Sequence, residues 1–164
     1  MEVPMSDSYP ATTATATIEQ EDCMIREAIS VLEQRLFQRG PELTSLPSAK
    51  RFLQLKLAPQ KHEVFGVVFL DTRHRVISFE ILFHGTIHAA PIYPRLVLQR
   101  AMELNCAAMV LAHNHPSGDV SPSQADRMLT QALVDLLAKV DVRVLDHFIV
   151  GSGEAFSFAE AGLI

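Results

Sequence analysis

The spacing of hydrophobic and polar residues changes several times along the chain, and each spacing predicts a different element. Residues 1–20 are rich in Thr, Ala, Ser and Pro and keep no regular period, so we expect a disordered tail. Hydrophobic residues then recur at the three-and-four spacing of a helix over 21–41, which Gly40 and Pro41 end. A second, short helix is expected after Ser48.

The middle and the end of the chain predict a sheet with helices around it. Residues 63–71 and 75–85 are rich in Val, Ile and Phe and are expected to form a hairpin. Residues 93–105 predict a helix that starts at a proline, and the apolar run 107–112 favours a central strand covered on both faces. A helix over 122–139 and strands over 142–151 and near 155–158 follow. This order predicts a mixed α/β (α+β) domain, with helices packed around one central mixed sheet.

The start of the long helix can be placed in two ways. Ser121 can cap it, with Pro122 in the first helical position and Gln124 completing a capping box, or Ser123 can cap it together with Asp126. The proline favours Ser121, and Ser123 and Asp126 would then lie inside the first two turns with free side chains. The residues expected on the buried face of this helix are Ala125, Met128, Leu129, Ala132, Leu133, Leu136, Leu137 and Val140.

Composition and charge narrow the class of protein. The chain has 164 residues, 48 % of them hydrophobic, and this is enough for one domain with a substantial core. Its net charge of −5 argues against nucleic acid as a partner, because nucleic acid is itself a polyanion. Cys23 and Cys106 are isolated, and no signal peptide or membrane-spanning run is present. We therefore expect a cytoplasmic protein with no membrane contact.

The segment "LAHNHPSGDVSPSQAD", residues 111–126, carries the chemistry. His113 and His115 follow an apolar strand at the i, i+2 spacing that places two side chains on one side of extended chain, with Asn114 pointing away. Asp126 flanks the buried face of the next helix and can reach back to them. Two imidazoles and one carboxylate with an open fourth position are the ligand set of a catalytic zinc site, where the metal activates a water molecule.

The same residues resemble a known motif. His113, His115, Pro116, Ser123 and Asp126 form the pattern His-x-His-Pro-x6-Ser-x2-Asp, which is similar to the JAMM motif of MPN-domain metallopeptidases. The longer text around it, from "GTIHAAPIYPR" to "ALVDLLAKVDVRVLDHFIVG", resembles the RadC family in particular, over about residues 42–164. The resemblance implies one MPN (JAB-type) domain over 42–164, with a cytidine-deaminase-like fold.

The resemblance also implies roles for single residues. One Zn²⁺ per chain would be held by His113, His115 and Asp126, and Ser123 would help to stabilise the oxyanion. The family uses an upstream glutamate as proton acceptor at the start of a buried strand, a position that Glu63 fits. Three other glutamates fit this position less well: Glu80, Glu103 and Glu154.

The activity implied is zinc-dependent hydrolysis of peptide or isopeptide bonds in a protein or peptide substrate. A non-catalytic MPN scaffold is the alternative, and a role in DNA processing is suggested only by the family name. We expect no helix-hairpin-helix element of the kind that longer RadC proteins carry, because the N-terminal part looks too short for it. Leu96 stands where many relatives have Glu. Asp146 and His147 also match the family, either as a self-satisfied pair at a strand or as support for the metal ligands. The oligomeric state is left open.

Overall fold

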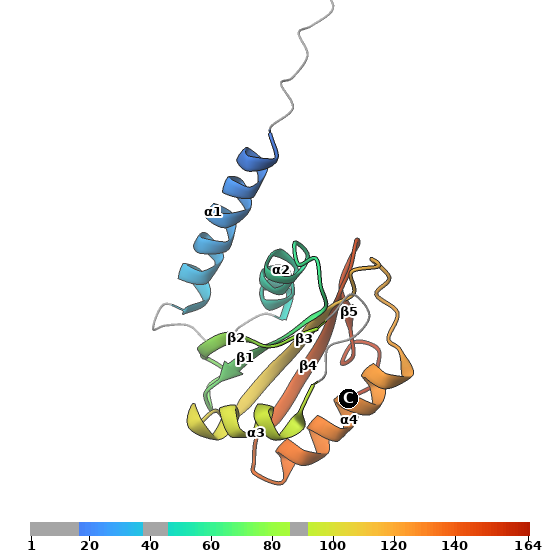
Figure 1. The fold of residues 1–164 in the computed structure, drawn as a ribbon. Helices are drawn as coiled ribbons and strands as arrows, with labels where there is room; N and C mark the ends of the chain where they lie inside the picture. The colour runs from blue at the N-terminus through green and yellow to red at the C-terminus, as the bar shows by residue number, and fades with distance from the viewer. Residues whose placement is uncertain (1–16, 38–45, 86–91) are drawn as a thin grey trace, which may run out of the picture.

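A five-stranded sheet forms the centre of this protein, whose computed structural model describes residues 17–37, 46–85 and 92–164 (Figure 1). Its strands lie in the order β2-β1-β3-β4-β5, and β3 and β4 are parallel while the other neighbours are antiparallel. The predicted mixed α/β fold is therefore confirmed. The strands are β1 (Val64–Leu70), β2 (Val76–His84), β3 (Ala108–Asn114), β4 (Arg143–Val150) and β5 (Phe156–Ser157).

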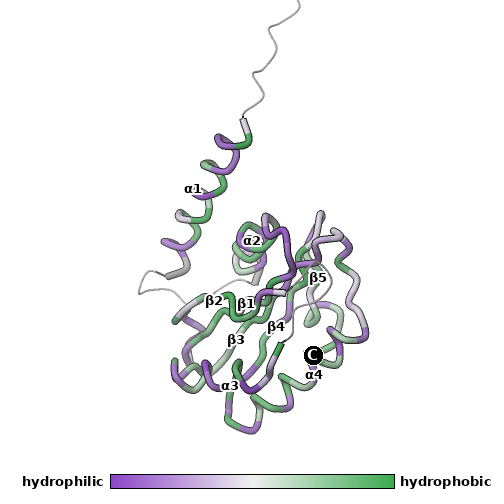
Figure 2. Tube along the Cα trace, in the orientation of Figure 1, coloured by the Kyte–Doolittle hydropathy of each residue, from purple (hydrophilic) through white to green (hydrophobic). Residues whose placement is uncertain are grey.

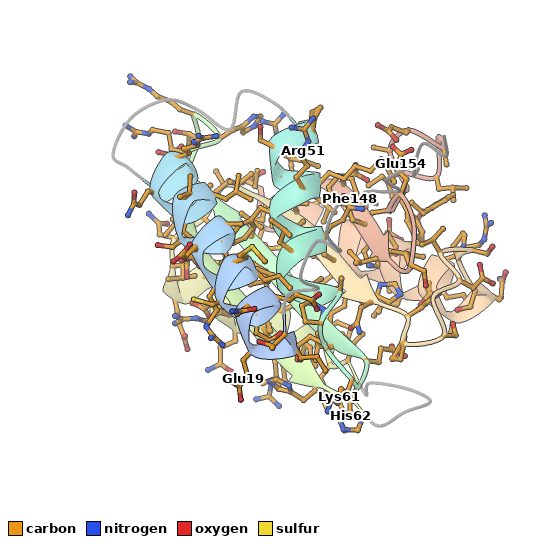
Figure 3. All side chains as sticks on the ribbon, turned by 90° about the horizontal axis from the view of Figure 1, so that it is seen from above. Glu19, Arg51, Lys61, His62, Phe148 and Glu154 are labelled. Carbon is orange, nitrogen blue, oxygen red and sulfur yellow. The ribbon has the colours of Figure 1, made fainter. Side chains whose placement is uncertain are left out.

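Helices cover both faces of the sheet. Helices α3 (Pro94–Glu103) and α4 (Gln124–Ala138) pack on one face, and α2 (Leu46–Leu57) packs on the other. Helix α1 (Ile18–Phe37) lies beside α2, as Figure 3 shows from above, and also contacts β2. Among the residues that the structure describes, no helix is long and apolar enough to cross a membrane.

The central strands are buried on both faces, which gives the domain two hydrophobic cores. All seven residues of β1 and all seven of β3 are buried, as the uninterrupted apolar runs predicted. Because side chains alternate along a strand, Val64 and Val68 of β1 face α2, while Phe65 and Val67 face α3 and α4. Figure 2 shows this apolar centre enclosed by more polar helices and loops.

Two helices begin earlier than their predicted starts. Helix α1 begins at Ile18, inside the stretch predicted to be a tail, because Thr17 and Gln20 form a reciprocal capping box at its N-terminus. Helix α2 begins at Leu46, before Ser48, with Pro47 in its first turn. The predicted end of the first helix, at Gly40 and Pro41, and residues 1–16 lie outside the described residues.

The predicted hairpin of β1 and β2 is present. The main-chain N–H and C=O of Asp71 close the turn by bonding Arg75 and His74, and His74 adopts a left-handed conformation with φ of 56°. The Asp71 carboxylate also accepts the N–H groups of Arg73 and Arg75. A short polar side chain that satisfies the turn's own backbone explains why these residues separate two apolar strands.

Candidate metal centre

The two histidines of the His-x-His motif lie at the end of β3 with their Nε2 atoms 3.0 Å apart. His113 is in the strand, pairs with Phe65 of β1, and is only 2 % exposed. His115 follows the strand, and its N–H donates to the carbonyl of Val150 at the end of β4. The predicted alternation is therefore present, with Asn114 directed elsewhere.

Asp126 reaches the histidines from the first turn of α4, but the predicted helix start was wrong. The cap is Ser123: its hydroxyl accepts the N–H of Asp126, while the Asp126 carboxylate accepts the N–H of Ser123. Ser121 instead donates its N–H to the Asp119 carboxylate, in the loop before the helix, and Pro122 precedes the cap. Asp126, at the third helical position, therefore selects Ser123 as the cap. The capping box that they form holds the Asp126 carboxylate in place.

The buried face of α4 agrees with the predicted one in part: Leu133 and Leu137 are buried as predicted, but other positions differ. Met128 is 65 % exposed, and Ala125 and Ala132 are exposed as well. Asp126 is largely enclosed, and the fully buried residues that share its side of the helix are Thr130, Leu133 and Leu137. The buried face therefore includes two polar residues, Asp126 and Thr130, which hydrophobic spacing alone does not indicate.

Three ligand atoms of His113, His115 and Asp126 lie within 4.8 Å of one another. Besides the 3.0 Å between the two Nε2 atoms, His113 Nε2 is 3.3 Å from Asp126 Oδ1, and His115 Nε2 is 3.6 Å from Asp126 Oδ2. Ligands placed tetrahedrally around Zn²⁺ at bond lengths of about 2.0–2.1 Å are separated by roughly 3.3 Å. The two Asp126 distances involve different carboxylate oxygens, so each histidine Nε2 has one Asp126 oxygen close to the ligand spacing of a tetrahedral ion.

The hydrogen bonds around His115 show what faces the centre of the cluster. Its Nδ1 lies 2.7 Å from the carbonyl oxygen of Asp119, and a carbonyl can only accept, so Nδ1 carries the proton. In the neutral ring, Nε2 then presents a lone pair toward Asp126 and His113. Electron-rich atoms from separate side chains therefore meet at one point.

The electrostatics of the cluster favour positive charge. The Asp126 carboxylate raises the pKa of His115 against the opposing effect of burial, and the Asp119 carbonyl and the charge of Glu63 act in the same direction. Burial alone would raise the pKa of Asp126, but His113, His115 and the Ser123 hydroxyl outweigh it and hold that pKa below its usual range. A cation between the three side chains would satisfy this preference.

Asp146 and His147, which the sequence left as two alternatives, turn out to do different things. The Asp146 carboxylate accepts hydrogen bonds from Ser157 Oγ and from the N–H groups of His147 and Ala159, and so fastens the C-terminal segment. The ring of His147 points the other way: its Nε2 is 2.8 Å from His113 Nδ1. Burial lowers the pKa of His147 well below its usual range, so this ring is neutral.

Glu63 precedes β1 on the same side of the sheet as the cluster. Continuing the pairing of Phe65 with His113 by two residues places Glu63 opposite His115. Its main-chain carbonyl accepts the N–H of Gly85, and its side chain is half-buried. Figure 3 shows the preceding residues, Lys61 and His62, at the outer edge of the molecule where the chain enters β1.

The three competing glutamates have partners elsewhere. Glu80 and Glu103 both pair with Arg100, and Glu154 pairs with Lys50. The three carboxylates are thus engaged away from the cluster, whereas the charge of Glu63 acts on His115 and helps to raise its pKa.

Two residues of this region were missed by sequence reasoning. Thr130 lies 2.6 Å from His147 Nδ1 and donates to the carbonyl of Asp126, also at 2.6 Å. Asn114 was expected only to point away, and it does so, but its side chain bonds the main chain that leads to Glu63. The one signal that could have indicated Thr130 was its helical spacing of three and seven residues from Leu133 and Leu137.

Comparisons with known protein sequences place this chain in a family. Residues 43–163 match the family model described as a RadC-like JAB domain. A UPF0758 protein of Stutzerimonas stutzeri is 56 % identical over 131 residues, which are 80 % of this chain and 58 % of that protein. A UPF0758 protein of Methylibium petroleiphilum is 57 % identical over 133 residues, 81 % of this chain and 60 % of the relative.

The relatives differ in length. The chain spans less than two thirds of the Stutzerimonas and Methylibium proteins. It matches a UPF0758 protein of Vibrio cholerae at 51 % identity over 142 residues, 87 % of this chain and 89 % of that relative. The part matched by the family model includes the whole of the cluster, since residues 113–126 lie within 43–163.

Proposed function

We propose that this chain, which belongs to the RadC family of JAB-domain proteins, is a zinc-dependent hydrolase of peptide or isopeptide bonds. The observation that carries the proposal is the convergence of His113, His115 and Asp126, whose ligand atoms lie within 4.8 Å of one another. A structural zinc site is closed, usually by cysteines, whereas these three ligands leave a fourth position for water or substrate.

The residues present fit one Zn²⁺ per chain. Two neutral imidazole nitrogens and one carboxylate oxygen are the donors this ion accepts, and hydrogen bonds from Ser123 and to Asp119 already orient two of the three ligands. The chemistry that Zn²⁺ supplies in such a site is the activation of a water molecule and the polarisation of a carbonyl group.

Glu63 would move the proton. Its place opposite His115 supports a role as the base that accepts a proton from the attacking water and then passes it to the leaving amine nitrogen. The amine is the poor leaving group of peptide and isopeptide hydrolysis, so delivering a proton to it is needed for the bond to break.

In the resting site, Ser123 would orient the metal ligand Asp126. Its hydroxyl lies 2.6 Å from Asp126 Oδ2 and donates to it, which orients the carboxylate toward the histidines. To stabilise the oxyanion of the tetrahedral intermediate, as the family resemblance implies, the hydroxyl has to turn away from Asp126 toward the substrate.

The first experiment measures metal content by elemental analysis after reconstitution with zinc. We expect about one zinc per chain in the wild type and none in the double variant His113→Ala/His115→Ala. A matched control is His74→Asn at the distant hairpin turn, where asparagine tolerates the left-handed conformation and zinc content should be unchanged. Absence of zinc from the wild type would contradict the proposal and favour a scaffold role.

The second experiment tests hydrolysis. Fluorogenic peptides and lysine isopeptide conjugates are incubated with the zinc-loaded chain, and newly formed amino groups are measured. Glu63→Gln should keep the zinc and lose activity by about 10²-fold or more, as expected for loss of a general base. Glu27→Gln, an exposed residue of α1, should keep both. Activity at the wild-type rate in Glu63→Gln would show that another group moves the proton.

A further inference from the structure

We propose that Thr130 and His147 form a directed hydrogen-bond relay that holds His113 in the single tautomer able to bind a metal. The proposal rests on the metal site inferred above and assigns positioning roles to two residues outside it. The relay runs from the main chain of α4, through Thr130 and His147, to His113 in β3.

The direction of the relay is set at its α4 end. The Thr130 hydroxyl lies 2.6 Å from the carbonyl oxygen of Asp126, and a carbonyl can only accept a hydrogen bond. The single hydroxyl proton is therefore used there. Since Thr130 Oγ1 is also 2.6 Å from His147 Nδ1, Oγ1 must accept from it, and His147 carries its proton on Nδ1.

The surroundings of His147 determine its other nitrogen. The side chain is 0 % exposed, stacks on Phe158 with ring centroids 4.9 Å apart, and meets the edge of Phe65 at 5.7 Å. An imidazole enclosed by phenyl rings, with the neighbouring Asp146 carboxylate bonded elsewhere, is neutral. Its Nε2 then has a lone pair and accepts a hydrogen bond.

His113 must supply that hydrogen bond. Its Nδ1 is 2.8 Å from His147 Nε2, so the proton of the neutral His113 ring lies on Nδ1 and the lone pair lies on Nε2. This Nε2 is the atom that faces His115 and Asp126. The opposite tautomer would place an N–H bond in the position where the ion has to bind.

The relay also ties together the elements that carry the ligands. The carbonyl that anchors it belongs to Asp126, so the same chain of bonds that orients His113 holds the helical turn from which the Asp126 carboxylate projects. Loss of the Thr130 hydroxyl should therefore disturb a ligand on β3 and a ligand on α4 together.

The experiment uses the full chain, zinc as the probe, and the variants Thr130→Val and Thr130→Ser. Long-range ¹H–¹⁵N spectra of the metal-free protein report the tautomer of each histidine, and competition with a chromogenic chelator reports the zinc affinity. We expect the wild-type His113 to be protonated on Nδ1. Thr130→Val should give mixed tautomers and a zinc affinity about 10- to 100-fold lower, and Thr130→Ser should restore both.

Two results would overturn the relay. One is a wild-type His113 protonated on Nε2; the other is a folded Thr130→Val variant with unchanged tautomer and zinc affinity. The wild-type spectra test the predicted tautomer of His113 even if Thr130→Val does not fold. A wild type that binds no zinc but has the expected tautomer would refute the proposed function while leaving the relay in place, so the two failures are distinguishable.

Discussion

The side-chain oxygen of Asn114 accepts the main-chain N–H of Val64 at 2.8 Å. The same side chain donates from Nδ2 to the carbonyls of Gln60 and His62, at 3.3 and 3.1 Å. The residue between the two proposed histidine ligands thus holds the main chain on either side of Glu63. The proposed ligands and the proposed base are fixed to one another by a single buried amide, which is 2 % exposed.

Replacing Asn114 should weaken the domain. Asn114→Ala leaves the Val64 N–H and two carbonyls without this partner, and we expect a loss of about 1–3 kcal/mol in the free energy of unfolding. Urea denaturation of the metal-free protein measures it. Gln131→Ala, on the exposed side of α4, should change stability by less than about 0.5 kcal/mol. Equal stability of the two variants would mean that the amide does not hold this segment.

The two candidate helix caps can be told apart by mutation. Ser123→Ala removes the hydroxyl that bonds the N–H and the carboxylate of Asp126, so it should cost about 1 kcal/mol and lower the zinc affinity. Ser121→Ala should cost less than about 0.5 kcal/mol. Denaturant titrations and chelator competition on both variants make the comparison. A larger loss from Ser121→Ala would restore the start of α4 that the sequence favoured.

The end of β4 packs against the loop that carries His115. A Cβ added to Gly151 would lie 2.4 Å from the carbonyl oxygen of Gly118, which is main chain and cannot turn aside. Gly118 in turn donates its N–H to the carbonyl of His115. Gly151→Ala should therefore displace this loop, cost about 1–3 kcal/mol and weaken zinc binding.

The matched control for that prediction is Gly153→Ala. A Cβ at Gly153 meets nothing within 4 Å, so stability and zinc affinity should both stay at wild-type values. The packing argument is refuted if the two alanine variants behave alike in denaturation and in zinc competition.

An ion pair away from the site gives a prediction for pH. Arg100 donates two hydrogen bonds of 2.7 Å to the Glu80 carboxylate, and they lower the pKa of Glu80 from 4.5. As pH falls below about 4.5, the unfolded chain therefore binds a proton before the folded chain does, and this contribution to stability is lost. Glu80→Gln should be less stable than the wild type at pH 7, with a difference that shrinks toward pH 3.

Denaturation at pH 7, 5, 4 and 3 measures this difference. Met128→Ala, an exposed position without charge, should differ from the wild type by an amount that does not vary with pH. A difference between Glu80→Gln and wild type that stays constant with pH would show that the ion pair contributes nothing beyond packing.

Much of this fold follows from local spacing. Apolar runs predicted β1 and β3 because both strands are covered on both faces, and the alternation of His113 and His115 predicted their convergence because extended chain repeats every two residues. Asp126 was indicated by its distance from the histidines along the chain and by the motif. Each of these patterns extends over only a few neighbouring residues, so it can be recognised from the sequence alone.

The rest depended on contacts between distant elements. Hydrophobic spacing indicated Leu133 and Leu137 correctly. It missed Asp126 and Thr130 on the same face of α4, because these are polar residues turned toward the interior, where the site satisfies them. The partner that selects the orientation of His113 comes from β4, 34 residues away. Nothing in the local pattern distinguishes His147, which supports a ligand, from Asp146, which fastens the C-terminus.

The two hydrophobic cores on either side of the sheet bear on how the site handles its ion. The strands and the helix that carry His113 and Asp126 are packed by residues such as Leu111, Leu133 and Phe148, none of which depends on a metal. Domains that fold only around zinc lose their structure with the ion, but a site built on an independent core is preorganised. Such a site can exchange its ion with the surroundings without unfolding, so occupancy would follow the free metal concentration.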